Sequence, residues 1–280
     1  MEIGITLFST DLAMDPVELA REAEARGFAS LYLPEHTHIP TSRRTPPPTG
    51  DAELAEEYKR SLDPYVALAA ASAVTERIRL GTGIALVAQH DAITLAKEIA
   101  TLDFLSGGRV VLGIGYGWNL DEMENHGIDT KRRRARVRET MLAMQALWSQ
   151  EVASFEGEFV RFAESWSWPK PVQQPRPRVL LGGAAGPTLF RHIAEYADGW
   201  LPIGGAGLAD SLGELRRVCE EAGRDPGALH IAPMGVLPTS EKLEHYRSIG
   251  CSEAVLRVPS APRDALMPVL DDFAKRYLDQ

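Results

Sequence analysis

The sequence predicts an α/β fold, namely a (β/α)8 TIM barrel with insertions in the loops at its C-terminal face. Short β-rich runs alternate with longer segments whose apolar residues recur at helical spacing, which is typical of a parallel sheet. Eight such runs fit into 280 residues, as a closed barrel requires. Segments 35–63, 116–133 and 151–177 are longer than simple connections, and the first two follow strand ends directly. We expect residues 1–280 to form one domain, with an open doubly wound sheet as the alternative.

Helix start and stop signals separate the predicted strands. The first helix is capped by Asp15, begins at Pro16 and ends before Gly27, and Glu18 completes a capping box. The pair "DP" at 63–64 repeats this pattern before the second helix. The predicted strands are 2–8, 29–34, 78–86, 109–115, 178–183, 199–204, 229–235 and 253–258.

The composition favours a small-molecule enzyme. A formal net charge of −9 gives no general attraction to nucleic acid or to an anionic membrane, and no stretch of about 18 apolar residues could span a bilayer. Met1 leads into "EIGITLF" without a signal sequence, and Cys219 and Cys251 show no metal-ligand spacing. We therefore expect a cytoplasmic protein with a small-molecule substrate and with no nucleic-acid or membrane partner.

Acid–base residues follow the second predicted strand in "LYLPEHTHIP". Glu35 and His36 lie at its end, where barrel enzymes carry catalytic residues. An imidazole beside a carboxylate can move a proton near neutral pH, so both are candidate catalytic residues. The alternative is that they only tie the long loop to the barrel. A metal site on His36 and His38 is not expected, because no further ligand cluster completes it.

Alternate glycines mark the fourth predicted strand, in "RVVLGIGYGWNLDEM". A dinucleotide fingerprint needs Gly-x-Gly-x-x-Gly in the first βα turn, whereas Gly113, Gly115 and Gly117 follow a different spacing at a later strand. Glycines at every second position remove the side chains from one face, so another backbone or a flat ligand can approach. Tight packing at the barrel mouth is the alternative.

The fifth predicted strand ends in "LGGAAGP". Gly182, Gly183, Ala184 and Gly186 precede a helix start at Pro187, and free amides at a helix N-terminus can hold a phosphate. An ordinary tight βα turn is the alternative reading of these residues.

A set of motifs in consistent order from about residue 2 to residue 205 resembles the luciferase-like monooxygenase superfamily. Within it, the pattern is most similar to the coenzyme F420-dependent oxidoreductases. Asp91 departs from the pattern, which has a proline just after His90. The motifs are "PEHTHIP", "RIRLGTGI", "LAKEIATLDFLSGGRVVLGIGYGWNLDEM", "HGID", "RRARVRETMLAMQALW", "GEF", "WPKPVQ" and "LLGGAAGPTLFRHIAEYADGWLP".

The resemblance implies a barrel that holds a flavin or deazaflavin at its mouth, commonly as a homodimer. Thr82, Gly83 and Ile84 would form a bulge supporting one face of the ring, with a cis peptide between Gly83 and Ile84, and Glu35 would be a further ring contact. An ordinary strand glycine is the alternative at this position.

The same resemblance implies that Gly115, Gly117, Trp118 and Asn119 line the cofactor pocket, because side chains at these glycines would collide with the ring. The alternative for Trp118 is that it is a core aromatic residue of the long loop and does not line the pocket. The phosphate of FMN or coenzyme F420 would bind at the 182–186 turn.

A basic run opens the helix after the fourth strand. It comprises Lys131, Arg132, Arg133, Arg134, Arg136 and Arg138. Cations at a helix N-terminus oppose the helix dipole, so acidic groups must compensate. Carboxylates elsewhere in the chain are the simpler partners, and the anionic oligoglutamate tail of coenzyme F420 is the alternative.

These expectations combine into an oxidoreductase that binds coenzyme F420 and transfers a hydride to or from a small organic substrate, with His36 managing the proton. An FMN-dependent monooxygenase and a non-catalytic deazaflavin-binding barrel are the alternatives. Phe8, the loop 37–60, and the aromatics Trp166 and Trp168 would select the substrate.

Overall fold

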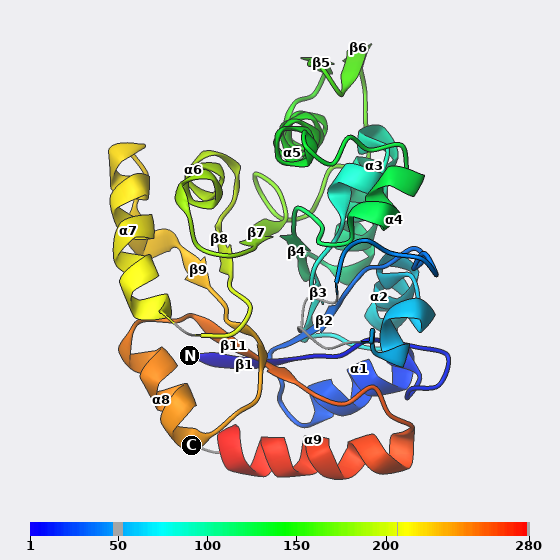
Figure 1. The fold of residues 1–280 in the computed structure, drawn as a ribbon, viewed down its shortest axis with the longest axis vertical. Helices are drawn as coiled ribbons and strands as arrows, with labels where there is room; N and C mark the ends of the chain where they lie inside the picture. The colour runs from blue at the N-terminus through cyan, green and yellow to red at the C-terminus, as the bar shows by residue number, and fades with distance from the viewer. Residues whose placement is uncertain (47–52, 206, 279–280) are drawn as a thin grey trace.

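A curled parallel sheet of nine strands forms the centre of the computed structural model, which describes residues 1–46, 53–205 and 207–278 (Figure 1). The strand order is β10-β11-β1-β2-β3-β4-β7-β8-β9, and every pairing in it is parallel. All eight predicted runs form strands. The strands are β1 (Glu2–Thr6), β2 (Ser30–Leu33), β3 (Arg79–Thr82), β4 (Val110–Ile114), β7 (Arg178–Gly182), β8 (Gly199–Leu201), β9 (His230–Ile231), β10 (Met234–Val236) and β11 (Glu253–Arg257).

The sheet curls back on itself through the seventh predicted strand. This run divides into β9 and β10 at Ala232 and Pro233, because a proline has no N–H to donate to a ladder. The two outermost strands of the sheet are thus consecutive in the chain, and Ile203 after β8 pairs with Met234 of β10. Apart from β11 and β1, which are the last and first strands of the chain, neighbouring strands in the sheet follow one another in the chain. An open doubly wound sheet would instead reverse its strand order at one point, so the fold is TIM-barrel-like.

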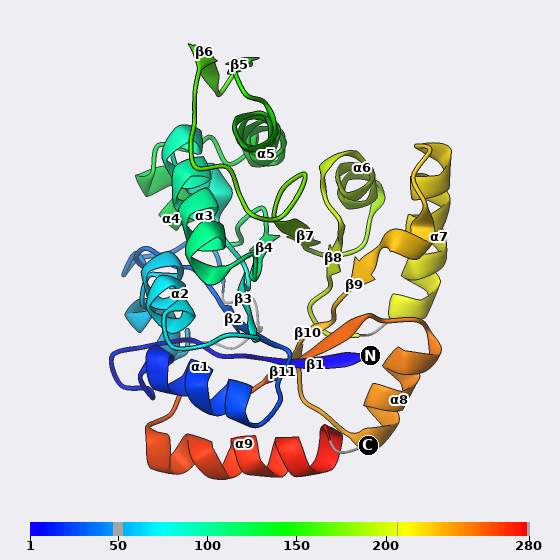
Figure 2. The same ribbon diagram turned by 180° about the vertical axis from the view of Figure 1, so that it is seen from behind.

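Helices cover the outside of the curled sheet (Figures 1 and 2). Asp15 and Asp63 cap the first two, as predicted, but Glu18 bonds to Arg263 on the last helix and does not complete a capping box. No helix in the described ranges is long and apolar enough to cross a membrane. The helices are α1 (Pro16–Ala25), α2 (Pro64–Ser72), α3 (Ala92–Ser106), α4 (Leu120–Asn125), α5 (Arg133–Ser149), α6 (Pro187–Tyr196), α7 (Leu208–Glu221), α8 (Ser240–Ser248) and α9 (Arg263–Tyr277), with short 3-10 turns η1 (Glu56–Arg60), η2 (Val87–Gln89) and η3 (Pro226–Ala228).

An antiparallel hairpin occupies part of the segment that the sequence predicts as a long loop. Strands β5 (Ala153–Glu156) and β6 (Arg161–Ser165) pair beyond α5, at the top of Figure 1. Glu139 of α5 holds the hairpin turn, because its carboxylate accepts backbone N–H groups from residues 158–160. Both strands are short and mostly exposed, so they lack the clear alternation of apolar and polar residues that predicts a strand.

A buried polar cluster lies where the strands begin, at the end of the sheet opposite the predicted site. The Glu253 carboxylate accepts hydrogen bonds from Ser30, from Tyr32 at 3.2 Å and from Arg79 at 3.4 Å. His230 adds a contact of 3.1 Å to the same carboxylate. Since Glu253 has no exposed surface, these partners replace the water that its charge would otherwise need.

Candidate active site

A cavity of about 560 Å³ opens at the carboxyl ends of the parallel strands. Its walls come from residues at or after the ends of β1, β2, β3, β4, β7, β8, β10 and β11, together with η1 and the start of α5. In barrel enzymes the loops at this end form the active site. The cavity is therefore the candidate active site.

Eight of the thirteen predicted site residues line this cavity. They are Glu35, His36, Gly83, Ile84, Gly117, Trp118, Gly182 and Gly183. The other five do not line it, and they are Thr82, Gly115, Asn119, Ala184 and Gly186. Thr82, Gly115 and Asn119 are buried against other protein groups, Gly186 is half-buried before α6, and Ala184 is exposed.

His36 is held between a carboxylate and an indole. Its Nδ1 lies 2.7 Å from Oε2 of Glu122, and Nε1 of Trp118 lies 3.3 Å from its Nε2. An indole N–H can only donate, so Nε2 accepts and Nδ1–H donates to Glu122. This network assigns the neutral tautomer with its proton on Nδ1. The imidazole lines the cavity, and its one acceptor nitrogen, Nε2, is shared with the Trp118 N–H.

Glu122 is a candidate functional residue that the sequence analysis did not single out. It is fully buried in the first turn of α4, and its second oxygen, Oε1, accepts the Thr37 backbone N–H at 3.2 Å. Asn119 caps α4 by accepting the N–H of Glu122 at 3.4 Å, and it is buried outside the lining of the cavity. The spacing Asn119-x-x-Glu122 is a capping pattern that would have drawn attention to Glu122.

Glu35 ties the segment after β3 to the end of β2. Its carboxylate accepts the backbone N–H of Leu86 at 2.6 Å and the Tyr65 hydroxyl at 3.3 Å, and it lies 2.5 Å from Nε2 of His90. Burial acts to lower the pKa of His90, but the hydrogen bond and charge of Glu35 outweigh it and raise that pKa above its usual value. Both oxygens of Glu35 are therefore engaged within the protein.

The bulge after β3 has the predicted backbone. The peptide bond between Gly83 and Ile84 is cis, and Gly83 and Ile84 line the cavity. The Thr82 hydroxyl points away and donates to the Gly113 carbonyl at 2.7 Å. Thr82 thus fastens β3 to β4 and is not part of the cavity wall.

The alternate glycines of β4 make room for the protein itself. A Cβ on Gly113 would lie 2.2 Å from the Thr82 carbonyl oxygen, and one on Gly115 would lie 1.8 Å from Cδ1 of Ile84. Neighbouring protein atoms therefore fill the space at both positions, which is the alternative of tight packing, and the collision with a ring expected at Gly115 is not the reason for that glycine. Gly117 lines the cavity and adopts a φ of +77°, which favours glycine.

The basic run divides between surface carboxylates and the cavity. Arg132 pairs with Glu158 and Arg138 with Glu195. Arg133 and Arg134 instead line the cavity, where the Arg134 guanidinium lies 5.4 Å from the centre of the Tyr116 ring. The Nε of Arg133 is buried without a hydrogen-bond partner, although its Nη1 donates to the Thr130 carbonyl at 2.6 Å.

The predicted substrate-selecting residues are only partly at the cavity. Phe8 lines it, as do Glu57 and Tyr58 from the loop 37–60. Trp166 and Trp168 lie beside the β5–β6 hairpin and do not line it, with 76% and 59% of their surface exposed. The prediction that these two tryptophans select the substrate is therefore wrong.

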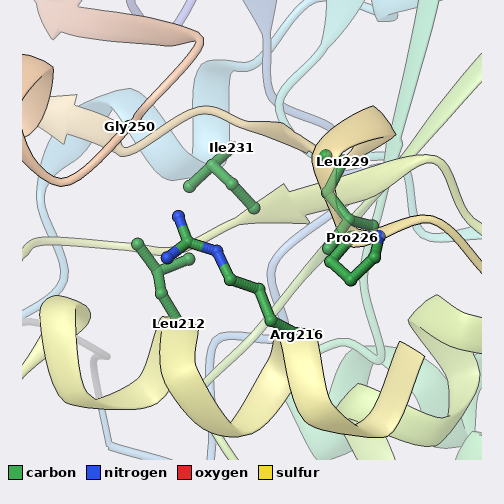
Figure 3. Close-up of a pocket in the computed structure, with 7 residues that line it drawn as sticks. Leu212, Arg216, Pro226, Leu229, Ile231 and Gly250 are labelled. Carbon is green, nitrogen blue, oxygen red and sulfur yellow. The ribbon is translucent and has the colours of Figure 1, made fainter. Parts of the chain in front are cut away.

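A second, smaller cavity of about 260 Å³ lies between α7 and β9 (Figure 3). Arg216 extends across it, between Leu212 and Ile231, and is the one charged side chain among the described residues of its lining. A single exposed arginine among aliphatic neighbours offers no acid–base pair. Within the described ranges, no group of three or more His, Cys, Asp or Glu residues could hold a metal ion either.

Two curated relatives resemble the chain over different shares of its length. An uncharacterised protein of Mycobacterium tuberculosis is 47% identical over 279 residues, which cover 99% of this chain and 98% of that protein. An F420-dependent glucose-6-phosphate dehydrogenase of Kineococcus radiotolerans is 32% identical over 224 residues, which cover 76% of this chain and 60% of that protein.

Two solved structures share the fold. The monooxygenase RslO1 from Streptomyces bottropensis superposes with a TM-score of 0.81 at 23% identity, covering 100% of this chain and 99% of that one. An F420-dependent secondary alcohol dehydrogenase, solved with an F420-acetone adduct, gives a TM-score of 0.76 at 17% identity, covering 98% of each chain. The model of the luciferase-like monooxygenase family matches residues 10–250, and the chain belongs to this family.

Proposed function

We propose that the protein is an oxidoreductase that binds coenzyme F420 and transfers a hydride to or from a small organic substrate. The observation that carries the proposal is the placement of the His36 imidazole, held by Glu122 and Trp118, in the wall of a cavity that Gly83 and Ile84 also line. A proton acceptor beside a flat backbone surface suits a reaction that moves a hydride and a proton together. The F420-dependent relative at 32% identity supports the choice of cofactor.

The residues at the cavity fit an anionic deazaflavin. Gly83 and Ile84 after β3, and Gly182 and Gly183 at the end of β7, line the cavity where the ring would bind. Neither Arg133 nor Arg134 has a carboxylate partner among the residues that the structure describes, so both can receive anionic groups. When bound, a deazaflavin supplies a carbon that accepts or donates a hydride.

His36 would manage the proton. In the direction of alcohol oxidation, the substrate hydroxyl would replace the Trp118 N–H at Nε2, and Nε2 would accept its proton while Nδ1–H continues to donate to Glu122, whose carboxylate stabilises the imidazolium. In the reverse direction the imidazolium returns the proton. Glu35 would act as a positioning residue, because its oxygens are engaged with Leu86, Tyr65 and His90.

We further propose that the protein is a homodimer. Val66 on α2 and Phe104 and Leu105 on α3 expose 72%, 56% and 62% of their surface, and these two helices pack side by side. These exposed apolar side chains on two neighbouring helices are the basis of the proposal. Light scattering after size exclusion would test this, since a monomer of 30.7 kDa at micromolar concentration would contradict it.

Anaerobic titration with oxidised and reduced coenzyme F420, and in parallel with FMN, tests the cofactor. We expect coenzyme F420 to quench the fluorescence of Trp118, which lines the cavity. Tight FMN binding with oxygen uptake, and no binding of coenzyme F420, would favour the monooxygenase alternative, for which RslO1 is a structural precedent. Binding of coenzyme F420 without turnover of any alcohol or carbonyl compound would favour a non-catalytic binding protein.

A further inference from the structure

We infer that the part of the cavity around His36 selects an uncharged alcohol, or the matching ketone, whose carbon body is an apolar ring or branched alkyl group. This inference deepens the proposed function and rests on it. It depends on two features of the structure, an aromatic enclosure around the imidazole and an ion pair in the lining of the same cavity.

The aromatic enclosure consists of Phe8, Tyr58 and Trp118. The Phe8 and Tyr58 ring centres lie 4.4 Å apart, and the Tyr58 ring meets Trp118 edge-on at 5.9 Å. The imidazole of His36 lies 5.5 Å from Tyr58 and 5.6 Å from Trp118, so it is at the centre of this group. Aromatic faces attract apolar surface and cations, but they offer an anionic group no compensation for lost water.

An ion pair neutralises the charges of this region. Nη2 of Arg257, at the end of β11, donates to Oε1 of Glu57 on η1 at 3.0 Å, and both residues line the cavity. An anionic substrate would have to compete with Glu57 for Arg257, and a cationic substrate would have to compete with Arg257 for Glu57. A neutral substrate leaves the pair intact.

The other arginines of the cavity are on a different part of its wall, where the proposed function assigns them to anionic groups of the cofactor. Arg134 lies over Tyr116, whose hydroxyl is 2.8 Å from Nδ1 of His192 on α6. Arg133 is anchored to the Thr130 carbonyl. In the lining that the structure describes, Arg257 is therefore the cation on the β11 side, and it is already paired.

Oxidation of the alcohol at this site would transfer one hydride to the deazaflavin and one proton to His36. The C–H bond of the carbinol carbon breaks and its hydride passes to the oxidised deazaflavin, while the O–H bond breaks and its proton passes to Nε2 of His36. The carbon–oxygen double bond of the ketone forms from the electrons of the O–H bond. The alcohol is oxidised by two electrons and the deazaflavin is reduced by two.

Three ring compounds of similar size test the selection. They are cyclohexanol, 4-hydroxycyclohexanecarboxylate and 4-aminocyclohexanol, which are neutral, anionic and cationic at pH 7. Saturation-transfer NMR detects their contact with the protein, both free and saturated with coenzyme F420, without requiring turnover. We expect contact and deazaflavin reduction with cyclohexanol, and at least about tenfold weaker responses with the two charged compounds. Preferential contact with either charged compound would overturn the inference.

A matched pair of variants tests the ion pair. Glu57→Gln frees Arg257 and should improve the response to the carboxylate probe about tenfold relative to cyclohexanol. Glu56→Gln is the control, because Glu56 is on the same turn but pairs outward with Lys59 and Arg60. Equal behaviour of the two variants would overturn the role of the pair.

The aromatic enclosure has its own variant. Phe8→Ala should weaken the cyclohexanol contact and raise its KM about fivefold, whereas Phe8→Leu should retain most of the contact. Coenzyme F420 binding to each variant verifies its fold. If the wild-type protein binds no coenzyme F420, the proposed function fails; if it binds the cofactor but makes no contact with cyclohexanol, the inference alone fails.

Discussion

The imidazole Nδ1 of His36 lies 2.7 Å from Oε2 of Glu122, although 86 residues separate the two in the chain. The carboxylate is fully buried, and its other oxygen accepts the Thr37 N–H, so it holds both the ring and the backbone of the segment after β2. Helix α4 exists at this point because Asn119 caps it. One short helix therefore sets both the orientation and the tautomer of the proposed proton acceptor.

His36→Ala should lower kcat by about 10²- to 10⁴-fold, because a general acid–base group contributes rate enhancement of that order. Coenzyme F420 affinity should stay within about twofold, since the imidazole bonds to Glu122 and Trp118 and the cofactor contacts proposed above are elsewhere. Stopped-flow reduction and fluorescence titration measure the two quantities separately. A near-normal kcat with a normal cofactor complex would remove His36 from the mechanism.

Glu122 should act through His36. Glu122→Ala should lower kcat more than it raises KM, and Glu122→Gln, which keeps an acceptor for Nδ1–H, should recover part of the loss. The imidazole nitrogen NMR signals of His36 give a readout that a general loss of stability would not imitate, because they distinguish the Nδ1–H from the Nε2–H tautomer. An unchanged tautomer in Glu122→Ala would contradict the positioning role.

Gly115→Ala tests the packing of β4 against the bulge. The added methyl would lie 1.8 Å from Cδ1 of Ile84, so we expect a loss of about 1–3 kcal/mol in the free energy of unfolding together with weaker cofactor binding. Ile84→Val removes the clashing carbon, and the double variant should regain much of the loss. Gly213→Ala on α7 is the control, since nothing lies within 4 Å of its added methyl. Chemical denaturation measures all four proteins.

Sequence could predict the strands and the glycine-rich approach at β4, but not which groups approach these glycines. Strand composition and the caps at Asp15 and Asp63 are local signals, so the strands and the first helices could be placed from them. The glycines could be recognised as a close approach, but the approaching groups are the Thr82 carbonyl at the end of β3 and the Ile84 side chain just after it, which are distant in the chain. Glu122 was missed for the same reason, because its partner His36 is distant in the chain.

Stability should fall at alkaline pH through His90. Its pKa is raised in the folded state by Glu35, so the stabilisation is fully present below the unfolded-state value of about 6.5 and is lost as pH rises through the folded-state value. Glu35→Gln removes the charge, and its melting temperature should depend less on pH across this interval than that of the wild type. Differential scanning calorimetry from pH 5.5 to about 9 makes the comparison. If the melting temperatures of the wild type and of Glu35→Gln changed equally with pH, the coupling of Glu35 to His90 would be contradicted.

The two arginines that line the cavity should contribute to cofactor affinity, unlike their neighbours in the basic run. The double variant Arg133→Ser, Arg134→Ser removes guanidinium groups that face the cavity without a carboxylate partner among the described residues. We expect coenzyme F420 to bind about 10- to 100-fold more weakly, because each hydrogen bond to a charged group contributes about 1.5–3 kcal/mol.

The control for these arginines is the double variant Arg132→Ser, Arg138→Ser, which lies on the same stretch but loses only the surface pairs with Glu158 and Glu195. Exposed ion pairs contribute little to the free energy of unfolding, and neither arginine lines the cavity, so the affinity for coenzyme F420 should be unchanged. A deazaflavin without the oligoglutamate tail separates two sources of the effect. If its affinity falls as much as that of coenzyme F420 in the cavity-facing variant, the arginines bind the phosphate or the ring; if only coenzyme F420 is affected, they bind the tail. Equal losses in the cavity-facing and surface variants would show that neither pair of arginines contacts the cofactor and that the run acts through the stability of α5.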